Sequence, residues 1–245
     1  MTLVRRWGEL TRVEIGELAP NALVVLPVGS TEQHGPHLAA GTDAIIVTEI
    51  ARRAAEAASS PETIVLAPTL AYGASDHHLP FGATLSLRIE TLARVLDDLL
   101  ASAARAGCRR MFILNGHGGN TATCVNATAE AARKHGLLCA AAIYSDLVEP
   151  GSVDVPLPGH AGQAETSLML AIAPECVRLE RAGPSPGHAR SLGRGVVVGD
   201  PDRWAALDGF TDRPQEASPE LGAALLEVCV RATAAAFERV AALDV

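Results

Sequence analysis

Short apolar runs of strand character alternate along this chain with longer stretches whose apolar residues recur at helical spacing. The predicted strands are residues 22–28, 63–67, 111–114 and 137–144. The predicted helices are residues 43–58, 92–100 and 120–135. Alternation of this kind favours a mostly parallel sheet with helices on both faces. A length of 245 residues suits one such unit, so we expect residues 1–245 to form a single α/β domain.

The charge balance and the apolar runs exclude some classes of partner. The formal net charge is −8 and lysine and arginine form no cluster, which argues against a nucleic-acid partner. The apolar runs are too short to span a membrane, and Arg5, Arg6 and Glu9 interrupt the region where a signal peptide would be apolar. The five cysteines are odd in number and lack CxxC spacing, so we expect reduced thiols of an intracellular protein and not a disulfide framework. We therefore expect a cytoplasmic protein with neither a nucleic acid nor a membrane as partner.

Two segments, residues 145–162 and 174–218, are rich in proline, glycine and aspartate and are predicted to be long loops. Loops of that length in a compact domain are usually functional or lie at subunit contacts. A short helix is expected between them, over residues 167–173. The final helix has clear start signals, with Ser218 as N-cap and Pro219 at the first helical position. Its apolar residues pack either into the core of the same chain or onto a neighbouring copy.

The first predicted strand leads directly into a stretch rich in metal-binding side chains, EQHGPH at residues 32–37, and Asp43 follows shortly after. Alternation along an extended chain puts residues i and i+2 on one side, so Glu32 and His34 can reach the same point. Imidazole and carboxylate ligands suit a borderline divalent ion such as zinc or manganese. This stretch therefore indicates a metal-dependent hydrolase.

A second loop with metal-binding side chains follows the third predicted strand, with the sequence NGHGGN at residues 115–120. In an open α/β sheet, sites form beyond the carboxyl ends of the strands, so His117 is expected at the same edge as the first loop. Asp43 lies at a predicted helix start, where its carboxylate can bridge two ions. His160 and Glu165 form a further candidate pair where a long loop meets a helix.

Each of these residues also has a purely structural interpretation. A carboxylate such as Asp43 at a helix start often caps the helix. His160 can cap a turn, and Glu165 can be a solvated acid that the helix dipole favours in the first turn. A single histidine in a glycine-rich loop, as at His117, is a weak signal by itself. The site hypothesis depends on all of these residues occurring together at strand ends.

The remaining histidines carry less information. His77 and His78 follow the segment 72–76, and ligand and surface roles are equally compatible with them. His37 is better explained by a supporting or turn role than by ligation. His135 and His188 are assigned to the surface.

Three motifs in order resemble the creatininase (creatinine amidohydrolase) family: GSTEQHGPH at 29–37 followed by Asp43, NGHGGN at 115–120, and HAGQAETS at 160–167. The resemblance extends from about residue 20 to 180, whereas residues 185–245 match only loosely. It implies a three-layer α/β/α sandwich and hydrolysis of C–N amide bonds by a metal-activated water. It also implies a binuclear centre of zinc, manganese or iron, and a homo-oligomer, often a hexamer.

The resemblance also assigns roles to individual residues. It implies five metal ligands: Glu32, His34, Asp43, His117 and Glu165. Asp43 would bridge the two ions, and His160 resembles the histidine that binds substrate and transfers a proton, with Glu165 as the second catalytic group. Creatininase itself has a glutamate ligand where this chain has Gly119. Glu165 must then supply the missing carboxylate, or the second ion binds weakly.

The nature of the amide substrate is less defined by the sequence. The residues expected to contact it are Tyr72, Ser75, His78, Gly118 and Gly119. Creatininase closes its pocket with tryptophans in the loop before His-Ala-Gly, but the corresponding loop here, residues 145–159, contains none. This argues against creatinine and for another small cyclic or linear amide. The alternative is a peptidase like the family member that trims the C-terminus of the mycofactocin precursor peptide.

A hypothesis from a different class is a non-catalytic metal- or nucleotide-binding α/β protein. The glycines at residues 116–119 resemble part of a dinucleotide-binding loop. However, Thr121 stands where that loop has its third glycine, and no phosphate-binding Gly-Lys-Ser/Thr motif occurs in the chain. A binding-only protein would also leave the acids and bases described above without a role.

Overall fold

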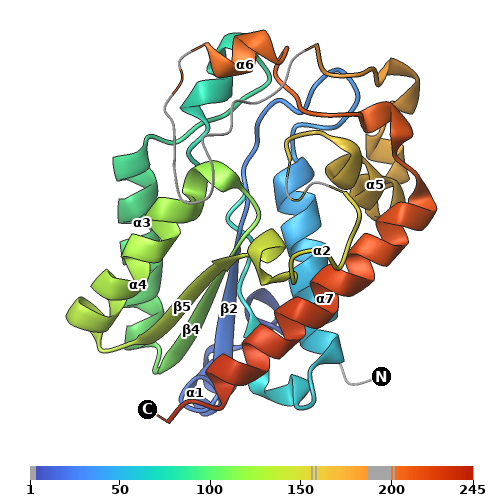
Figure 1. The fold of residues 1–245 in the computed structure, drawn as a ribbon. Coiled ribbons are helices and arrows are strands. Elements are labelled where there is room, and N and C mark those ends of the chain that lie inside the picture. The colour runs from blue at the N-terminus through green and yellow to red at the C-terminus, as the bar shows by residue number, and fades with distance from the viewer. Residues whose placement is uncertain (1–3, 156, 158, 187–199, 201, 245) are drawn as a thin grey trace.

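The computed structural model describes residues 4–155, 157, 159–186, 200 and 202–244. At its centre is a parallel sheet of five strands in the order β1-β3-β2-β4-β5. The strands are β1 (Arg5–Arg6), β2 (Leu23–Val28), β3 (Ile64–Leu66), β4 (Arg110–Asn115) and β5 (Leu138–Ile143). The carboxyl ends of all five strands therefore lie at one edge of the sheet, which is the upper edge in Figure 1.

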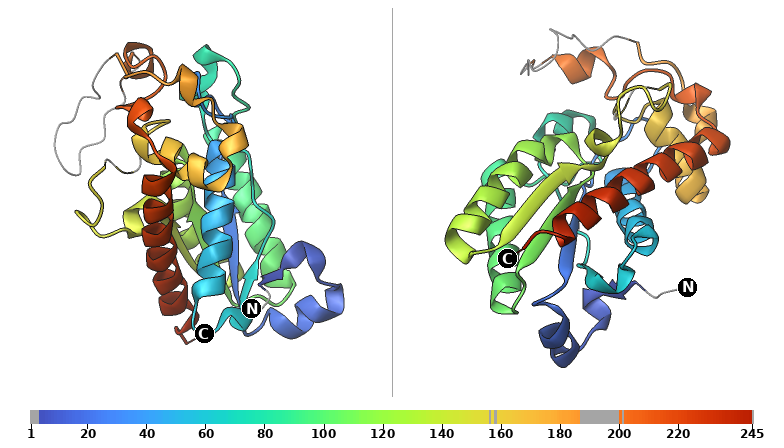
Figure 2. Two further views of the ribbon diagram at one scale, coloured as in Figure 1. Left: turned by 90° about the vertical axis from the view of Figure 1, so that its right-hand side faces the viewer. Right: turned by 60° about the horizontal axis from the view of Figure 1, so that its bottom comes forward.

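Helices cover both faces of this sheet, which confirms the predicted three-layer arrangement (Figure 1). The α-helices are α1 (Arg12–Leu18), α2 (Thr42–Ala57), α3 (Ile89–Arg105), α4 (Thr121–His135), α5 (Gln163–Ile172), α6 (Arg203–Ala206) and α7 (Pro219–Ala241). On one face α3 packs against α4, and on the other α2 and α5 pack against α7. The two further views in Figure 2 show the same separation of layers.

Alternating side chains of the buried strands divide the interior into two cores. Leu23 and Val25 of β2 belong to the core under α2 and α7, whereas Val24 and Leu26 belong to the core under α3 and α4. Because successive side chains of a strand point to opposite faces, a strand buried on both sides is apolar at every position. This explains the continuous apolar run that the sequence shows here.

The long C-terminal helix packs into the core of its own chain. Ser218 is its N-cap and accepts a hydrogen bond from the backbone N–H of Leu221 at 3.1 Å, as predicted. Leu225 and Leu226 are buried. Phe237 meets Phe112 of β4 edge to face, with ring centroids 5.1 Å apart.

Some local predictions differ from the structure. Helix α5 begins at Gln163, not at residue 167, so Glu165 belongs to its first turn. The short elements β1 and α1 were not expected. The region 174–218 is not continuous loop, since α6 and several 3₁₀ turns lie among its described residues. None of the described helices is both long and apolar enough to cross a membrane.

Candidate metal centre

A close approach of two elements brings the first motif to the start of α2. Strand β2 ends beside Gly29, where a Cβ atom would lie 2.6 Å from the Cα atom of Ala44. Only glycine allows the backbone to come this near. The loop after β2 therefore passes directly over the first turn of α2, which contains Asp43.

The Asp43 carboxylate lies between two histidines. Its Oδ1 atom is 3.1 Å from Nε2 of His34, and its Oδ2 atom is 3.1 Å from Nδ1 of His117. The N-cap of α2 is Gly41, and no side chain caps the helix. The capping interpretation of Asp43 is therefore wrong, and one carboxylate oxygen faces each imidazole.

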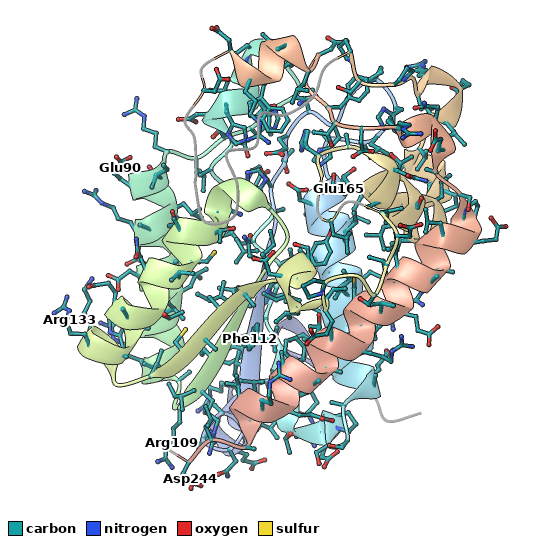
Figure 3. The ribbon with its side chains drawn as sticks, viewed as in Figure 1. Glu90, Arg109, Phe112, Arg133, Glu165 and Asp244 are labelled. Atoms are coloured by element: carbon teal, nitrogen blue, oxygen red, sulfur yellow. The ribbon has the colours of Figure 1, made fainter. Side chains whose placement is uncertain are left out.

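Two more carboxylates complete the arrangement, one on each side. Oε1 of Glu32 lies 3.3 Å from Nδ1 of His117, and Oε2 of Glu165 lies 3.8 Å from Nε2 of His34. All five predicted ligands are buried. They form two overlapping groups that share Asp43: one with Glu32 and His117, and one with His34 and Glu165. Glu165 is seen above the carboxyl edge of the sheet in Figure 3.

Three carboxylate oxygens of this cluster lack a hydrogen-bond partner. Both oxygens of Glu32 and Oδ2 of Asp43 are fully buried without a hydrogen-bond partner. Burying a charged oxygen with no partner is strongly unfavourable. A divalent cation held by carboxylates and imidazoles would remove this deficit, and this donor set matches the preferences of zinc and manganese. The residues present therefore fit a metal ion.

Backbone carbonyls orient both histidines so that a bare nitrogen faces the carboxylates. Nδ1 of His34 lies 3.1 Å from the carbonyl oxygen of Glu32, and Nε2 of His117 lies 3.1 Å from that of Ala74. A ring nitrogen next to a carbonyl must carry the hydrogen. In the neutral form, the lone pairs are therefore on Nε2 of His34 and Nδ1 of His117, as metal coordination requires.

Protons occupy this cluster in the absence of a cation. Burial opposes the imidazolium of His34, but Asp43, Glu165 and Glu32 raise the pKa of His34 to about 10. The pKa of His117 is likewise raised despite its burial, by Asp43 and Glu32. The pKa of Glu165 is raised to about 8, mainly because burial disfavours its charged form. The raised pKa values therefore favour the imidazolium forms of His34 and His117 and the neutral form of Glu165.

Three further histidines surround the Glu32 side of the cluster. Nδ1 of His160 and Nε2 of His78 lie 3.4 and 3.5 Å from Oε1 of Glu32. The ring of His77 stacks against that of His117 with centroids 5.8 Å apart, and His77 also groups with Glu32 and His117 as a potential metal-binding set. The sequence left a surface role open for both His77 and His78. For His78 that role is wrong, because its side chain is buried.

The other residues expected to contact substrate occupy different environments. The Ser75 hydroxyl lies 2.5 Å from that of Ser30 and 3.3 Å from Nε2 of His117, so it lies behind a predicted ligand. Tyr72 has an exposed fraction of 47%. Gly118 has open space where a side chain would be. Their contacts with substrate remain predictions.

Gly119 differs sharply from Gly118. A Cβ atom at Gly119 would overlap the carbonyl oxygen of Ala74 and Nε2 of His117. A glutamate at this position is incompatible with the observed backbone. The third carboxylate comes instead from Glu165 in the first turn of α5, which also accepts a hydrogen bond from the backbone N–H of Ala161 at 2.6 Å.

The histidines assigned structural or surface roles lie as follows. Nε2 of His37 is 2.9 Å from the carbonyl oxygen of Ala161, so His37 ties the first motif to the loop before α5. His135, half-buried at the end of α4, pairs at 3.0 Å with Asp97 of the neighbouring helix α3. His188 lies outside the described residues.

Two residues of the site were not identified from the sequence. Trp204 of α6 lies over the histidines, with ring centroids 4.4 Å from His78 and 5.0 Å from His160. The side chain of Gln33 contacts both of these histidines. Residues 145–159 contain no tryptophan, but Trp204, from a later segment, packs against the histidines instead. Sequence spacing carries no signal for that contact.

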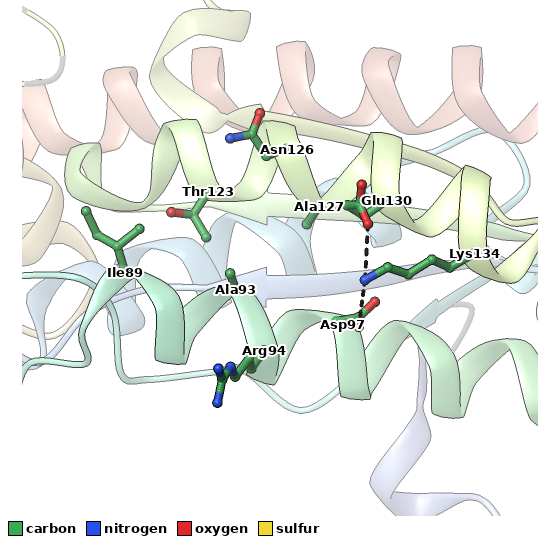
Figure 4. Close-up of a pocket in the computed structure, with 9 residues that line it drawn as sticks. All are labelled: Ile89, Ala93, Arg94, Asp97, Thr123, Asn126, Ala127, Glu130 and Lys134. Carbon is green, nitrogen blue, oxygen red and sulfur yellow. Dashed lines mark hydrogen bonds and ion pairs between the residues drawn. The ribbon is translucent and has the colours of Figure 1, made fainter.

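A separate groove of about 240 Å³ lies between α3 and α4 (Figure 4). Three of its charged side chains are paired, since the Lys134 ammonium lies 3.1 Å from both Asp97 and Glu130. Among the described residues, none that lines this groove belongs to a potential metal-binding set.

Comparison with known proteins agrees with this geometry. The sequence model of the family Creatininase, described as creatinine amidohydrolase, matches residues 8–237. The mycofactocin precursor peptide peptidase of Mycobacterium tuberculosis is 35% identical, over 95% of this chain and 92% of its own length. The creatinine amidohydrolase of Pseudomonas putida is 32% identical, over 94% and 95%. A crystal structure of creatininase superposes with a TM-score of 0.84 at 31% identity over the full length of both chains. The chain belongs to the creatininase family.

Proposed function

We propose that this creatininase-family hydrolase cleaves a C–N amide bond at a centre of two divalent metal ions. The observation that carries the proposal is the Asp43 carboxylate, which directs one oxygen toward each of two groups of ligands. Carboxylate and imidazole donors converge on both sides of it, and three of the carboxylate oxygens have no hydrogen-bond donor. Hydrolysis of C–N bonds is the reaction of the named relatives.

The identity of the metals is part of the proposal. Solved creatininase structures include a Zn–Zn form of a mutant enzyme and an Mn form, and iron is a third candidate from the family resemblance. We assign Glu32, Asp43 and His117 to one ion, and His34, Asp43 and Glu165 to the other. Two such ions supply Lewis acidity to polarise the carbonyl and to lower the pKa of a water molecule.

The remaining groups act on protons and on substrate orientation. His160 is held 3.4 Å from Glu32, where it can take a proton from the nucleophile side and pass it to the leaving nitrogen. Its pKa is lowered by burial and by the neighbouring histidines, which favours the neutral ring that a proton acceptor needs. Trp204 packs against His78 and His160 and would help to exclude water from the reaction.

The substrate is a small cyclic or linear amide, and the second candidate is the C-terminus of a peptide. The peptide candidate is favoured by the 35% identity to a precursor peptide peptidase over nearly the whole chain. The exposed Gly118, with open space where a side chain would be, also leaves room for an extended chain beside this loop. Creatinine and a synthetic peptide with a free C-terminus are the two probes that separate these candidates, with products identified by mass spectrometry.

The metal content of the full chain is the direct test. We expect about two zinc, manganese or iron ions per chain by elemental analysis. Glu32→Gln should lose metal and hydrolysis together, because it removes the negative charge of a carboxylate whose two oxygens have no hydrogen-bond partner. Glu62→Gln on the exposed surface is the matched control and should retain both. Glu32→Gln protein that keeps two ions and full activity would refute the ligand assignment.

We further propose that the enzyme is a cytoplasmic homo-oligomer, a hexamer by family resemblance, with no nucleic-acid or membrane partner. The free state of all five cysteines supports a reducing compartment. The net charge of −8 supports the absence of a nucleic-acid partner. The apolar face of helix α7 is already buried in its own chain, so that face is not available for a subunit contact.

A further inference from the structure

The orientation of the buried Gln33 side-chain amide is determined by two backbone partners. Its Oε1 atom accepts a hydrogen bond from the N–H of Gly35 at 2.9 Å. Its Nε2 atom donates to the carbonyl oxygen of Gly209 at 2.6 Å. Exchanging oxygen and nitrogen would place two acceptors together and two donors together. The amide therefore has one orientation, and one hydrogen of Nε2 remains available.

The second Nε2 hydrogen of Gln33 has two histidine nitrogens within reach. Nδ1 of His78 lies at 2.8 Å and Nε2 of His160 lies at 3.2 Å. However, Nε2 of His160 is also 3.0 Å from the backbone carbonyl oxygen of Gln33. A carbonyl oxygen requires a donor, so Nε2 of His160 carries its own hydrogen and cannot accept another. The hydrogen of the amide therefore goes to Nδ1 of His78.

These hydrogen bonds place opposite groups on the far sides of the two rings. His78 accepts at Nδ1, so its hydrogen is on Nε2, which lies 3.5 Å from Oε1 of Glu32. His160 donates from Nε2, so its lone pair is on Nδ1, which lies 3.4 Å from the same oxygen. The rings stack with centroids 4.2 Å apart and planes 16° apart. A donor and an acceptor thus lie side by side at one point of the site.

The hydrogen bond from Gln33 also selects the charge state of His78. An amide N–H directed at Nδ1 of His78 at 2.8 Å requires a lone pair on that nitrogen, which only the neutral ring has. A neutral imidazole has one donor and one acceptor nitrogen, whereas an imidazolium has two donors. The hydrogen-bond partner of the rear nitrogen therefore decides which group each ring presents.

We propose that Gln33 is a positioning residue that holds His78 and His160 in opposite tautomers, so that His78 presents an N–H and His160 a lone pair beside Glu32. Amide hydrolysis needs both functions: a donor toward the oxygen that gains negative charge, and an acceptor for a proton that later goes to the leaving nitrogen. The catalytic part of this inference rests on the proposed function. The tautomers themselves are a property of the folded chain and can be measured without substrate.

The tautomers are tested by long-range ¹H–¹⁵N NMR of full-length, zinc-loaded protein with labelled histidine, with signals assigned from His78→Asn and His160→Asn. We expect a bare Nδ1 and a protonated Nε2 in His78. In Gln33→Glu the side chain can accept but not donate, so the His78 hydrogen should move to Nδ1. If wild-type His78 already carries its hydrogen on Nδ1, or if Gln33→Glu leaves its tautomer unchanged, the proposal is wrong. This result does not depend on whether any amide is hydrolysed.

The functional consequence is tested by a double-mutant cycle, with whichever probe, creatinine or the synthetic peptide, is turned over. Gln33→Met should lower kcat by about 10²-fold with little change in KM, since it removes a group that acts on the transition state. In the His78→Gln background the same change should have little further effect, because Gln33 acts through His78. Gln215→Met at the exposed surface is the control. Independent, multiplying effects of Gln33 and His78 would contradict the positioning role.

Discussion

At the residue scale, His34 and Glu165 keep their protons in the metal-free protein to a higher pH than in the unfolded chain. The ordinary pKa values are 6.5 and 4.5, and the folded values are about 10 and about 8. Above pH 7 the folded protein therefore binds more protons than the unfolded chain at these two sites, so stability decreases as pH rises. His78 and His160, with lowered pKa values, are neutral in both states over most of this range.

We therefore expect the Tm of metal-free protein to fall between pH 7 and 10, measured by differential scanning fluorimetry. His34→Asn should have a shallower slope, because it removes a group that keeps its proton well above pH 7. Protein saturated with zinc or manganese should lose most of the slope, because a bound cation replaces the protons. A metal-free Tm that stays constant over this pH range would contradict the assigned protonation states.

Gly119 and Gly118 offer a matched pair of substitutions in one loop. Gly119→Ala puts a Cβ atom against the Ala74 carbonyl and the His117 ring, and Gly118→Ala puts one into open space. We expect Gly119→Ala to displace His117, to lower metal content and to destabilise the protein by about 1–3 kcal/mol, as overpacking does. Gly118→Ala should retain both ions. Elemental analysis and denaturant unfolding measure the two quantities, and equal behaviour of the two variants would contradict this explanation.

The sequence predicts those residues of the site whose neighbours are close along the chain or lie at the ends of adjacent strands. Glu32 and His34 are two positions apart, and His117 follows a strand that pairs with β2. Gln33 and Trp204 were missed for the opposite reason. Gln33 reaches Gly209 across 176 positions, and Trp204 contacts the histidines from a segment whose position no local pattern determines. Tertiary contacts of this kind depend on the path of the whole chain.

At the scale of single elements, the apolar periodicity predicted the main strands and helices, but the boundary of α5 was wrong by four residues. The loop was predicted to end at residue 162 and the helix to begin at residue 167, which left Gln163, Ala164 and Glu165 outside both. In the structure they form the first turn of a helix that packs on α7. The position of the Glu165 carboxylate beside His34 depends on that packing, because Glu165 lies in the first turn of α5.

Gly222 allows this packing. A Cβ atom at Gly222 of α7 would overlap the carbonyl oxygen of Ser167 in α5. We expect Gly222→Ala to destabilise the protein by about 1–3 kcal/mol and to lower metal content by shifting Glu165. Gly16→Ala on α1 is the matched control, since a side chain there meets open space and a helix gains stability from alanine. The helix-packing explanation would be refuted by a Gly222→Ala protein with wild-type Tm and metal content.

At the scale of the whole molecule, one stretch of chain next to the site exposes several large apolar side chains. They lie between residues 72 and 89, and their exposed fractions are 47% for Tyr72, 50% for Leu79, 59% for Leu85 and 60% for Ile89. Exposed apolar surface of this kind commonly marks a contact with another protein. Because the apolar face of α7 is buried in its own chain, this stretch is the stronger candidate for an apolar contact between copies.

We expect light scattering after size-exclusion chromatography to give a mass several times that of one chain. The double substitution Leu79→Glu and Leu85→Glu should reduce that mass toward a single chain, because charges at a subunit contact are desolvated without a partner. Leu99→Glu, at an exposed position on α3, is the control and should leave the mass unchanged. The stretch also contains His77 and His78, so dissociation should lower metal affinity or activity as well, while an unchanged mass in the double variant would exclude this stretch as the contact.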